Sequence, residues 1–112
     1  MIRVALLAYD GVEALDFAGP FEVFTTASRV HARTEAGGPL FEVVPVAAAA
    51  GPVRARAGLT ILPEATLADA GAFGVLLVPG GVVDDVRADR VVLEWLAETH
   101  AAARLTASVC TG

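Results

Sequence analysis

The sequence predicts an α/β fold in which helices cover both faces of a doubly wound, mostly parallel sheet. Short continuous apolar runs, typical of strands buried on both faces, alternate with stretches that have the spacing of amphipathic helices. Turns rich in glycine and proline follow two of these runs, at Asp10-Gly11 and at Pro79–Gly81. Because ligands bind at the carboxyl ends of parallel strands, these turns mark where a site is expected.

The apolar runs predict four main strands. They cover Arg3–Tyr9, Phe41–Ala47, Val75–Val78 and 104–109. Pro45 interrupts the second run, and a proline there favours a sheet edge or a strand end. Residues 34–40 are expected to form a loop, and residues 47–67 short extended pieces with a possible hairpin.

Two helices are expected between these strands. The first is predicted to begin near Pro20, because proline suits the first helical position, with Asp16 and Gly19 in an irregular turn ahead of it. The second follows Asp89, which is the expected N-cap. Its apolar side is expected to comprise Val92, Leu93 and Leu96.

Composition excludes several classes of function. A formal net charge of −5 disfavours binding of nucleic acid or of an anionic membrane by these residues. No apolar run reaches the ~18 residues of a membrane helix, and the first residues lack the features of a secretory signal. One cysteine cannot form an internal disulfide, so a cytoplasmic location is expected. No metal site is expected, since Asp84-Asp85 reads as a solvated turn and His31 and His100 as surface residues.

Cys110 is the first candidate for chemistry. It follows an apolar run and is flanked two residues away by Ser108 and Gly112, which loosely matches a nucleophile elbow. A following helix would direct N–H groups at the sulfur and favour the thiolate. The alternative is an inert cysteine buried in a core strand.

Two other stretches could complete such a site. Gly80 and Gly81 follow a strand, where backbone N–H groups can serve as an oxyanion hole, with the Thr111 N–H as a second donor. The alternative is a turn that merely ends the strand. Asp16 lies in an apolar turn where burial could keep its carboxyl group partly protonated for acid–base work, although helix capping is the commoner use of aspartate. Glu13 and Glu22 are weaker candidates.

Four segments together resemble the ThiJ/PfpI superfamily, which shares the flavodoxin-like sandwich of the class I glutamine amidotransferases. They are GVEALDFAGPFEVF (11–24), GLTILPEATLAD (58–69), LLVPGG (76–81) and ASVCTG (107–112). LDFAGPFEVF with SVCTG is similar to a narrower branch, which includes isocyanide hydratases and the amino-terminal sensor domains of AraC-type transcription regulators. The resemblance covers nearly the whole chain in the order of the family.

The resemblance implies a role for individual residues. Cys110 would be the nucleophile, Asp16 the acid–base group that faces it, and Thr111 would line the site with its amide and hydroxyl. Gly81, with Gly80 beside it, would supply the other oxyanion-hole amide. The segment that carries Asp16 also suggests Gly19 and Pro20 as substrate-binding residues.

One departure narrows the chemistry. Protease-like and glyoxalase-like members tend to have a histidine directly after the cysteine, where this chain has Thr111. Peptide hydrolysis is therefore disfavoured, and hydration of a small molecule such as an isocyanide is the leading interpretation. The alternatives are a ligand-sensing domain of a transcription regulator and a redox-responsive protein. The resemblance implies no cofactor, a small-molecule substrate or effector, and a homodimer.

The length suggests that residues 1–112 are the amino-terminal part of a single domain. About six strand–helix units would need about 180 residues, and the predicted helix after Cys110 begins where these residues end. We therefore expect 104–109 and Val75–Val78 to be open to water, and little catalysis from these 112 residues alone.

Overall fold

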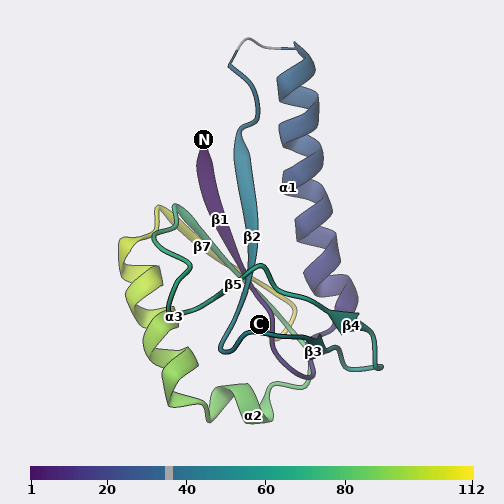
Figure 1. Ribbon diagram of the computed structural model, residues 1–112, viewed down its shortest axis with the longest axis vertical. Coiled ribbons are helices and arrows are strands. Elements are labelled where there is room, and N and C mark those ends of the chain that lie inside the picture. The colour runs from purple at the N-terminus through teal and green to yellow at the C-terminus, as the bar shows by residue number, and fades with distance from the viewer. Residues whose placement is uncertain (35–36) are drawn as a thin grey trace.

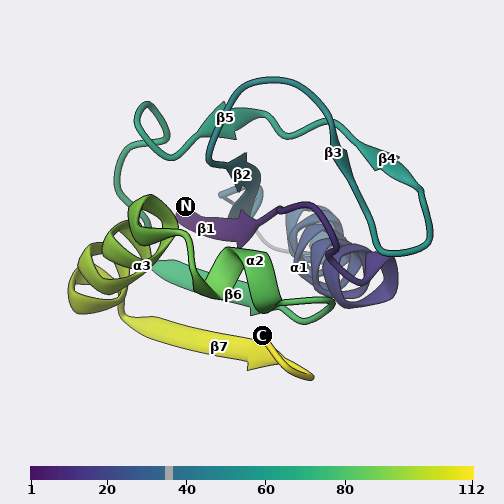
Figure 2. The same cartoon turned by 90° about the horizontal axis from the view of Figure 1, so that it is seen from below.

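The computed structural model describes residues 1–34 and 37–112 and has the predicted α/β architecture (Figure 1). Five parallel strands form one sheet in the order β5-β2-β1-β6-β7. Helix α1 lies on one side of this sheet and α3 on the other, which confirms the doubly wound arrangement (Figure 2). The strands are β1 (Ile2–Leu7), β2 (Phe41–Ala47), β5 (Ala65–Thr66), β6 (Val75–Pro79) and β7 (Leu105–Val109).

The remaining elements are short, apart from the two main helices. Strands β3 (Val53–Arg54) and β4 (Thr60–Ile61) pair as an antiparallel hairpin, as expected for this part of the chain. The helices are α1 (Ala14–Thr34), α2 (Asp84–Arg87) and α3 (Arg90–Ala102). The expected loop at 34–40 includes residues 35–36, which lie outside the described residues. Among the described helices, none is long and apolar enough to cross a membrane.

Burial differs sharply between the inner strands and the edge strand β7. The middle of β1 is inaccessible to water, with Leu6 0% exposed, whereas Leu105 at the start of β7 is 56% exposed. The expectation that Val75–Val78 is open to water is wrong for Val75, Leu76 and Leu77, which are buried. The reason is that β6 is an inner strand between β1 and β7, and its side chains belong to the core cluster that also includes Val92 of α3.

The start of α1 corrects the sequence prediction. The helix begins at Ala14, six residues before Pro20, so Asp16, Gly19 and Pro20 all lie inside it. Its inward face already starts at Phe17, which is buried, and this periodicity outweighs the preference of proline for a first helical position. Because proline has no N–H, the backbone carbonyl of Asp16 loses its usual helical donor.

Other local predictions had mixed outcomes. Asp89 caps α3 as expected, since its carboxylate accepts the N–H groups of Val91 and Val92. Asp84-Asp85 forms the exposed start of the short helix α2 rather than a turn. His31, expected at the surface, lies in the last turn of α1 and is half-buried, and its Nδ1 is 2.8 Å from the Gly38 carbonyl oxygen.

Pro45 occupies a position that needs no backbone donor. Its carbonyl accepts the N–H of Glu64 at 3.0 Å, so its nitrogen faces the same side, away from β1. Among the described strands, only the two-residue β5 pairs with β2 on that side, further along at Val46 and Ala47. The prediction of a sheet edge or a strand end is therefore wrong, because an inner strand can hold a proline where the neighbouring strand demands no donor from it.

Candidate active site

Cys110 lies on a tight turn directly after β7. Its φ of 56° is the only positive value at a non-glycine residue in the described chain, and its side chain is exposed. The N–H of Gly112 donates to the Val109 carbonyl at 3.0 Å and closes the turn. A Cβ at Gly112 would overlap the carbonyl oxygen of Val78, so this position requires glycine. The sequence thus presents a thiol at the tip of a strained turn, and Cys110 is not a core residue here.

The neighbouring turn after β6 directs one backbone N–H toward Cys110-Thr111. The Gly80 carbonyl accepts the N–H of Glu13 at 2.8 Å. Because a trans peptide points its carbonyl and its N–H in opposite directions, this bond turns the Gly81 N–H away from Glu13. That N–H donates instead to the Thr111 hydroxyl at 3.3 Å. The structure therefore brings Gly81 and Thr111 together.

Both glycines of this turn are needed for close approach. A Cβ at Gly80 would lie 2.7 Å from the Thr111 nitrogen. A Cβ at Gly81, where φ is +153°, would overlap the Gly11 carbonyl oxygen and lie 2.7 Å from the Glu13 nitrogen. This packing shows that the pair does more than end a strand, because the turn is pressed between two other segments.

Asp16 lies in the first turn of α1 and is half-buried. Its helix starts directly after Glu13, whose N–H donates to the Gly80 carbonyl, so Asp16 lies three residues along the chain from that bond. Within residues 1–34 and 37–112, no hydrogen bond joins the Asp16 carboxylate to Cys110. Gly19 and Pro20 lie one turn further along α1, and a Cβ at Gly19 would meet no atom within 4 Å.

Tyr9 is a residue of this region that the sequence reasoning missed. Its ring is buried, and its hydroxyl donates to the Pro79 carbonyl at 2.7 Å. Burial, with a smaller contribution from the Asp16 charge, raises the pKa of Tyr9 to about 12. The available signal was a single tyrosine at the end of an apolar run, just before the Asp10-Gly11 turn.

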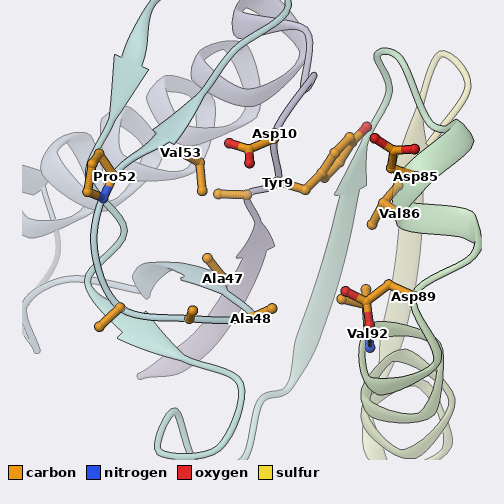
Figure 3. A pocket seen from close by; sticks show the side chains of 13 residues that line it. Tyr9, Asp10, Ala47, Ala48, Pro52, Val53, Asp85, Val86, Asp89 and Val92 are labelled. Atoms are coloured by element: carbon orange, nitrogen blue, oxygen red, sulfur yellow. Dashed lines mark hydrogen bonds between the residues drawn. The ribbon is translucent and has the colours of Figure 1, made fainter.

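Two hollows border Tyr9. An apolar one of about 130 Å³ lies below the elbow, between Pro79, Thr111 and Gly112. A larger one of about 270 Å³ opens beyond β1 and β2, where Figure 3 shows the Tyr9 side chain extending toward β6 and α2. Cys110 lines neither of them. The described residues contain no group of three or more His, Cys, Asp or Glu side chains that could hold a metal.

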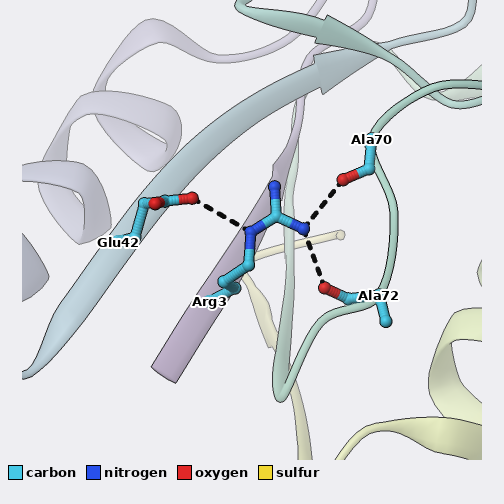
Figure 4. Close-up of polar contacts among 4 residues, drawn as sticks. All are labelled: Arg3, Glu42, Ala70 and Ala72. Atoms are coloured by element: carbon cyan, nitrogen blue, oxygen red, sulfur yellow. Dashed lines mark hydrogen bonds and ion pairs between the residues drawn. The ribbon is translucent and has the colours of Figure 1, made fainter. Parts of the chain in front are cut away.

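The opposite end of the sheet is fixed by a single side chain, that of Arg3 (Figure 4). Its Nε lies 3.0 Å from a Glu42 carboxylate oxygen, and one terminal nitrogen donates to the carbonyls of Ala70 and Ala72 at 2.8 and 2.9 Å. The guanidinium also lies 4.5 Å from the centre of the Phe73 ring. These contacts provide hydrogen-bond donors for backbone carbonyls of the loop that leads into β6.

Comparison with known proteins agrees with this architecture. The model of the DJ-1/PfpI family matches residues 2–112, and that is nearly the entire chain. The chain belongs to the DJ-1/PfpI family. The resemblance stated from the four sequence segments is therefore confirmed.

Three relatives give this membership detail. An isonitrile hydratase from Pseudomonas putida is 30% identical over 112 residues, which are 99% of this chain and 44% of that protein. An uncharacterised protein of Streptomyces lividans is 32% identical over 98% of this chain and 74% of its own length. The crystal structure of a ThiJ/PfpI family protein from Pseudomonas syringae superposes with a TM-score of 0.81 at 28% identity, over 99% of this chain and 43% of that one. The chain thus spans less than half of the hydratase.

Proposed function

We propose that the chain forms part of a cysteine-dependent hydratase that converts a small isocyanide to an N-formamide. The observation that carries this proposal is the exposed Cys110 thiol, held at positive φ and followed by Thr111, whose hydroxyl accepts the Gly81 N–H. The similarity to an isonitrile hydratase supports the choice of substrate, because isonitrile is another name for isocyanide.

The reaction needs one nucleophile and one proton carrier. The Cys110 thiolate attacks the terminal carbon of R–N≡C, and a C–S bond forms. Asp16, in its acid form, protonates that carbon and gives a thioimidate, R–N=CH–S. Water then adds its oxygen to the same carbon and one proton to nitrogen. When the C–S bond breaks, Asp16 regains a proton from the added oxygen, and R–NH–CHO and the thiolate are released.

The Gly81 and Thr111 amides are proposed to bind the oxygen that water supplies. In the structure the Gly81 N–H is occupied by the Thr111 hydroxyl at 3.3 Å. A substrate oxygen would take the place of this hydroxyl and exchange one hydrogen bond for another. A threonine after the cysteine supplies no imidazole base, which fits hydration better than peptide hydrolysis.

Turnover of a simple alkyl isocyanide by the intact protein tests this proposal, with the formyl proton followed by NMR. Replacing Cys110→Ala should abolish formamide production, while Ser108→Ala, an exposed neighbour, should keep it within about threefold of wild type. Undiminished turnover by Cys110→Ala would refute the mechanism. Binding of isocyanides without turnover by the wild type would favour the sensor-domain alternative.

The proposal also concerns the extent of the domain and its assembly. We propose that residues 1–112 are the amino-terminal part of one DJ-1/PfpI domain and that the protein acts as a homodimer on small molecules. Family membership supports this, and the matched 44% of the hydratase is consistent with it. Light scattering of the intact protein should give twice the subunit mass.

A further inference from the structure

The turn after β6 has little stiffness of its own. It carries two consecutive glycines, and glycine has the fewest conformational restrictions of any residue. Its geometry therefore depends on hydrogen bonds to the segment that follows β1. Two are backbone bonds, from Glu13 N–H to the Gly80 carbonyl at 2.8 Å and from Val82 N–H to the Gly11 carbonyl at 2.9 Å.

The third bond comes from a side chain, that of Tyr9. Its hydroxyl donates to the Pro79 carbonyl at 2.7 Å, and the bond is buried. This carbonyl belongs to the peptide that precedes Gly80, whereas Glu13 holds the peptide that follows it. Two successive peptide planes are thus fixed on either side of Gly80, and the second one carries the Gly81 N–H.

Loss of the Tyr9 hydroxyl would release the first of these planes. The Pro79 carbonyl would lose its buried donor, and a buried carbonyl without a partner is unfavourable unless it moves to find one. Rotation about Gly80 is the easiest movement available, because no Cβ opposes it. Such a rotation would change the direction of the Gly81 N–H relative to Cys110.

We propose that Tyr9 is a positioning residue, whose buried hydroxyl holds the turn that aims the Gly81 N–H at the Cys110 elbow. The inference rests on the proposed use of Cys110 as nucleophile and of Gly81 as oxyanion donor. It does not depend on the identity of the substrate.

The test compares two reactions of Cys110 in the intact protein. Acylation by p-nitrophenyl acetate passes through an oxyanion: the thiolate attacks the ester carbonyl, and p-nitrophenolate leaves. Alkylation by iodoacetamide develops no such oxyanion and reports only on the thiolate. Tyr9→Phe should lower the acylation rate about tenfold and leave alkylation within twofold, a smaller loss than the ~10²–10³ for removing an oxyanion donor itself. Equal acylation in Tyr9→Phe and wild type would overturn the proposal.

Ser28→Ala is the matched control. The Ser28 hydroxyl is buried and joins α1 to the backbone of Phe41 in β2, accepting its N–H at 2.8 Å and donating to its carbonyl at 3.1 Å. Its removal should lower stability without changing the ratio of acylation to alkylation. A fall of this ratio in Ser28→Ala as large as that in Tyr9→Phe would also overturn the proposal, because a general loss of packing would then explain both.

Fluorinated tyrosine provides a second route if Tyr9→Phe does not fold. Tyr9 is the only tyrosine of residues 1–112, and site-specific incorporation of 3,5-difluorotyrosine at position 9 changes this residue alone and lowers the pKa of its phenol. Once ionised, the phenol can no longer donate to Pro79. The acylation-to-alkylation ratio should therefore fall at a lower pH in the fluorinated protein than in the wild type. Superimposable pH profiles would contradict the role of Tyr9.

These measurements separate this inference from the proposed function. A lowered acylation ratio in Tyr9→Phe, in a protein that turns over no isocyanide, would support the positioning role and refute the hydratase. Isocyanide turnover by the wild type, with an unchanged acylation-to-alkylation ratio in Tyr9→Phe, would support the hydratase and refute the positioning role. In a protein that shows both activities, Tyr9→Phe should lower kcat and leave KM within about twofold.

Discussion

The turn after β6 and the turn after β7 contribute the two halves of the candidate site, and they are held very differently. The first is sandwiched between other segments and receives hydrogen bonds from the residues that follow β1. The second lies at the edge of the sheet, with an exposed Cys110, and is closed by one short backbone bond. A rigid donor thus faces a nucleophile whose setting depends mainly on the fit of Gly112 against β6.

This contrast shows which turn fixes the geometry of the candidate site and which turn leaves the nucleophile accessible. Oxyanion stabilisation requires a preorganised donor, and the buried turn provides one. A nucleophile requires access, and the edge strand provides that. The variants below test this division, from the largest expected effect to the smallest.

The first prediction concerns a substitution in the buried turn after β6. Gly81→Ala should destabilise the protein by roughly 4 kcal/mol, because its Cβ would overlap a backbone carbonyl at a φ of +153°. Gly51→Ala is the control: its φ is +102°, but no atom lies within 4 Å, so a loss of about 1 kcal/mol from strain alone is expected. Chemical denaturation of the intact protein measures both. Equal losses would show that the turn is not crowded.

The second prediction compares the stability cost of truncating a leucine in β6 with the cost of truncating a leucine in β7. Leu76→Ala in β6 should cost about 3 kcal/mol, because the side chain is 1% exposed and leaves a cavity. Leu105→Ala in β7, at 56% exposure, should cost less than about 1 kcal/mol. Denaturation midpoints check the difference. A cost at Leu105 that matched the cost at Leu76 would mean that β7 is covered in the intact protein.

The third prediction uses pH. Between pH 10 and about 12 the unfolded chain loses the Tyr9 proton while the folded protein keeps it, so stability should be full below pH 10 and fall as the pH rises. A rise of the Tyr9 pKa from 10.0 to about 12 corresponds to roughly 2–3 kcal/mol. Residues 1–112 contain no lysine and no other tyrosine, so the part of this fall that disappears in Tyr9→Phe belongs to Tyr9.

Unfolding free energies measured across that window, with tyrosinate absorbance as the readout of ionisation, check the prediction. Tyr9→Phe should show no such fall. Asp16→Asn should lower the pKa of Tyr9, since it removes the negative charge that helps to raise it. A wild-type curve parallel to that of Tyr9→Phe would contradict the buried setting of this hydroxyl.

The fourth and smallest effect concerns Gly19. Gly19→Ala should stabilise the protein by about 0.5–1 kcal/mol, because a Cβ there meets no atom in the structure and alanine is the better helix former. Thermal melting measures the gain. If Gly19 binds substrate as the family resemblance suggests, the same variant should also raise KM. A stabilised variant with unchanged KM would remove Gly19 from the site.

The sequence predicted the parts of this architecture that depend on local pattern. Apolar runs located the main strands, and Asp89 located the start of α3. Gly80, Gly81 and Gly112 indicated the turns after β6 and β7. The start of α1 was misplaced because a proline preference was given more weight than the face that begins at Phe17. The bond from Tyr9 to Pro79 joins residues 70 positions apart, so no local pattern could reveal it.

Trapping the adduct on Cys110 tests the proposed chemistry most directly. Intact-mass spectrometry after rapid mixing with an isocyanide and acid quenching detects the adduct, and comparison with Cys110→Ala assigns it to the one cysteine of residues 1–112. If Cys110 is the nucleophile, wild-type protein should gain the mass of one isocyanide molecule, Asp16→Asn should accumulate less of this adduct because protonation traps it, and Cys110→Ala should gain none. Formamide production by the wild type with no adduct at any mixing time, and equal production by Cys110→Ala, would contradict covalent catalysis at this elbow.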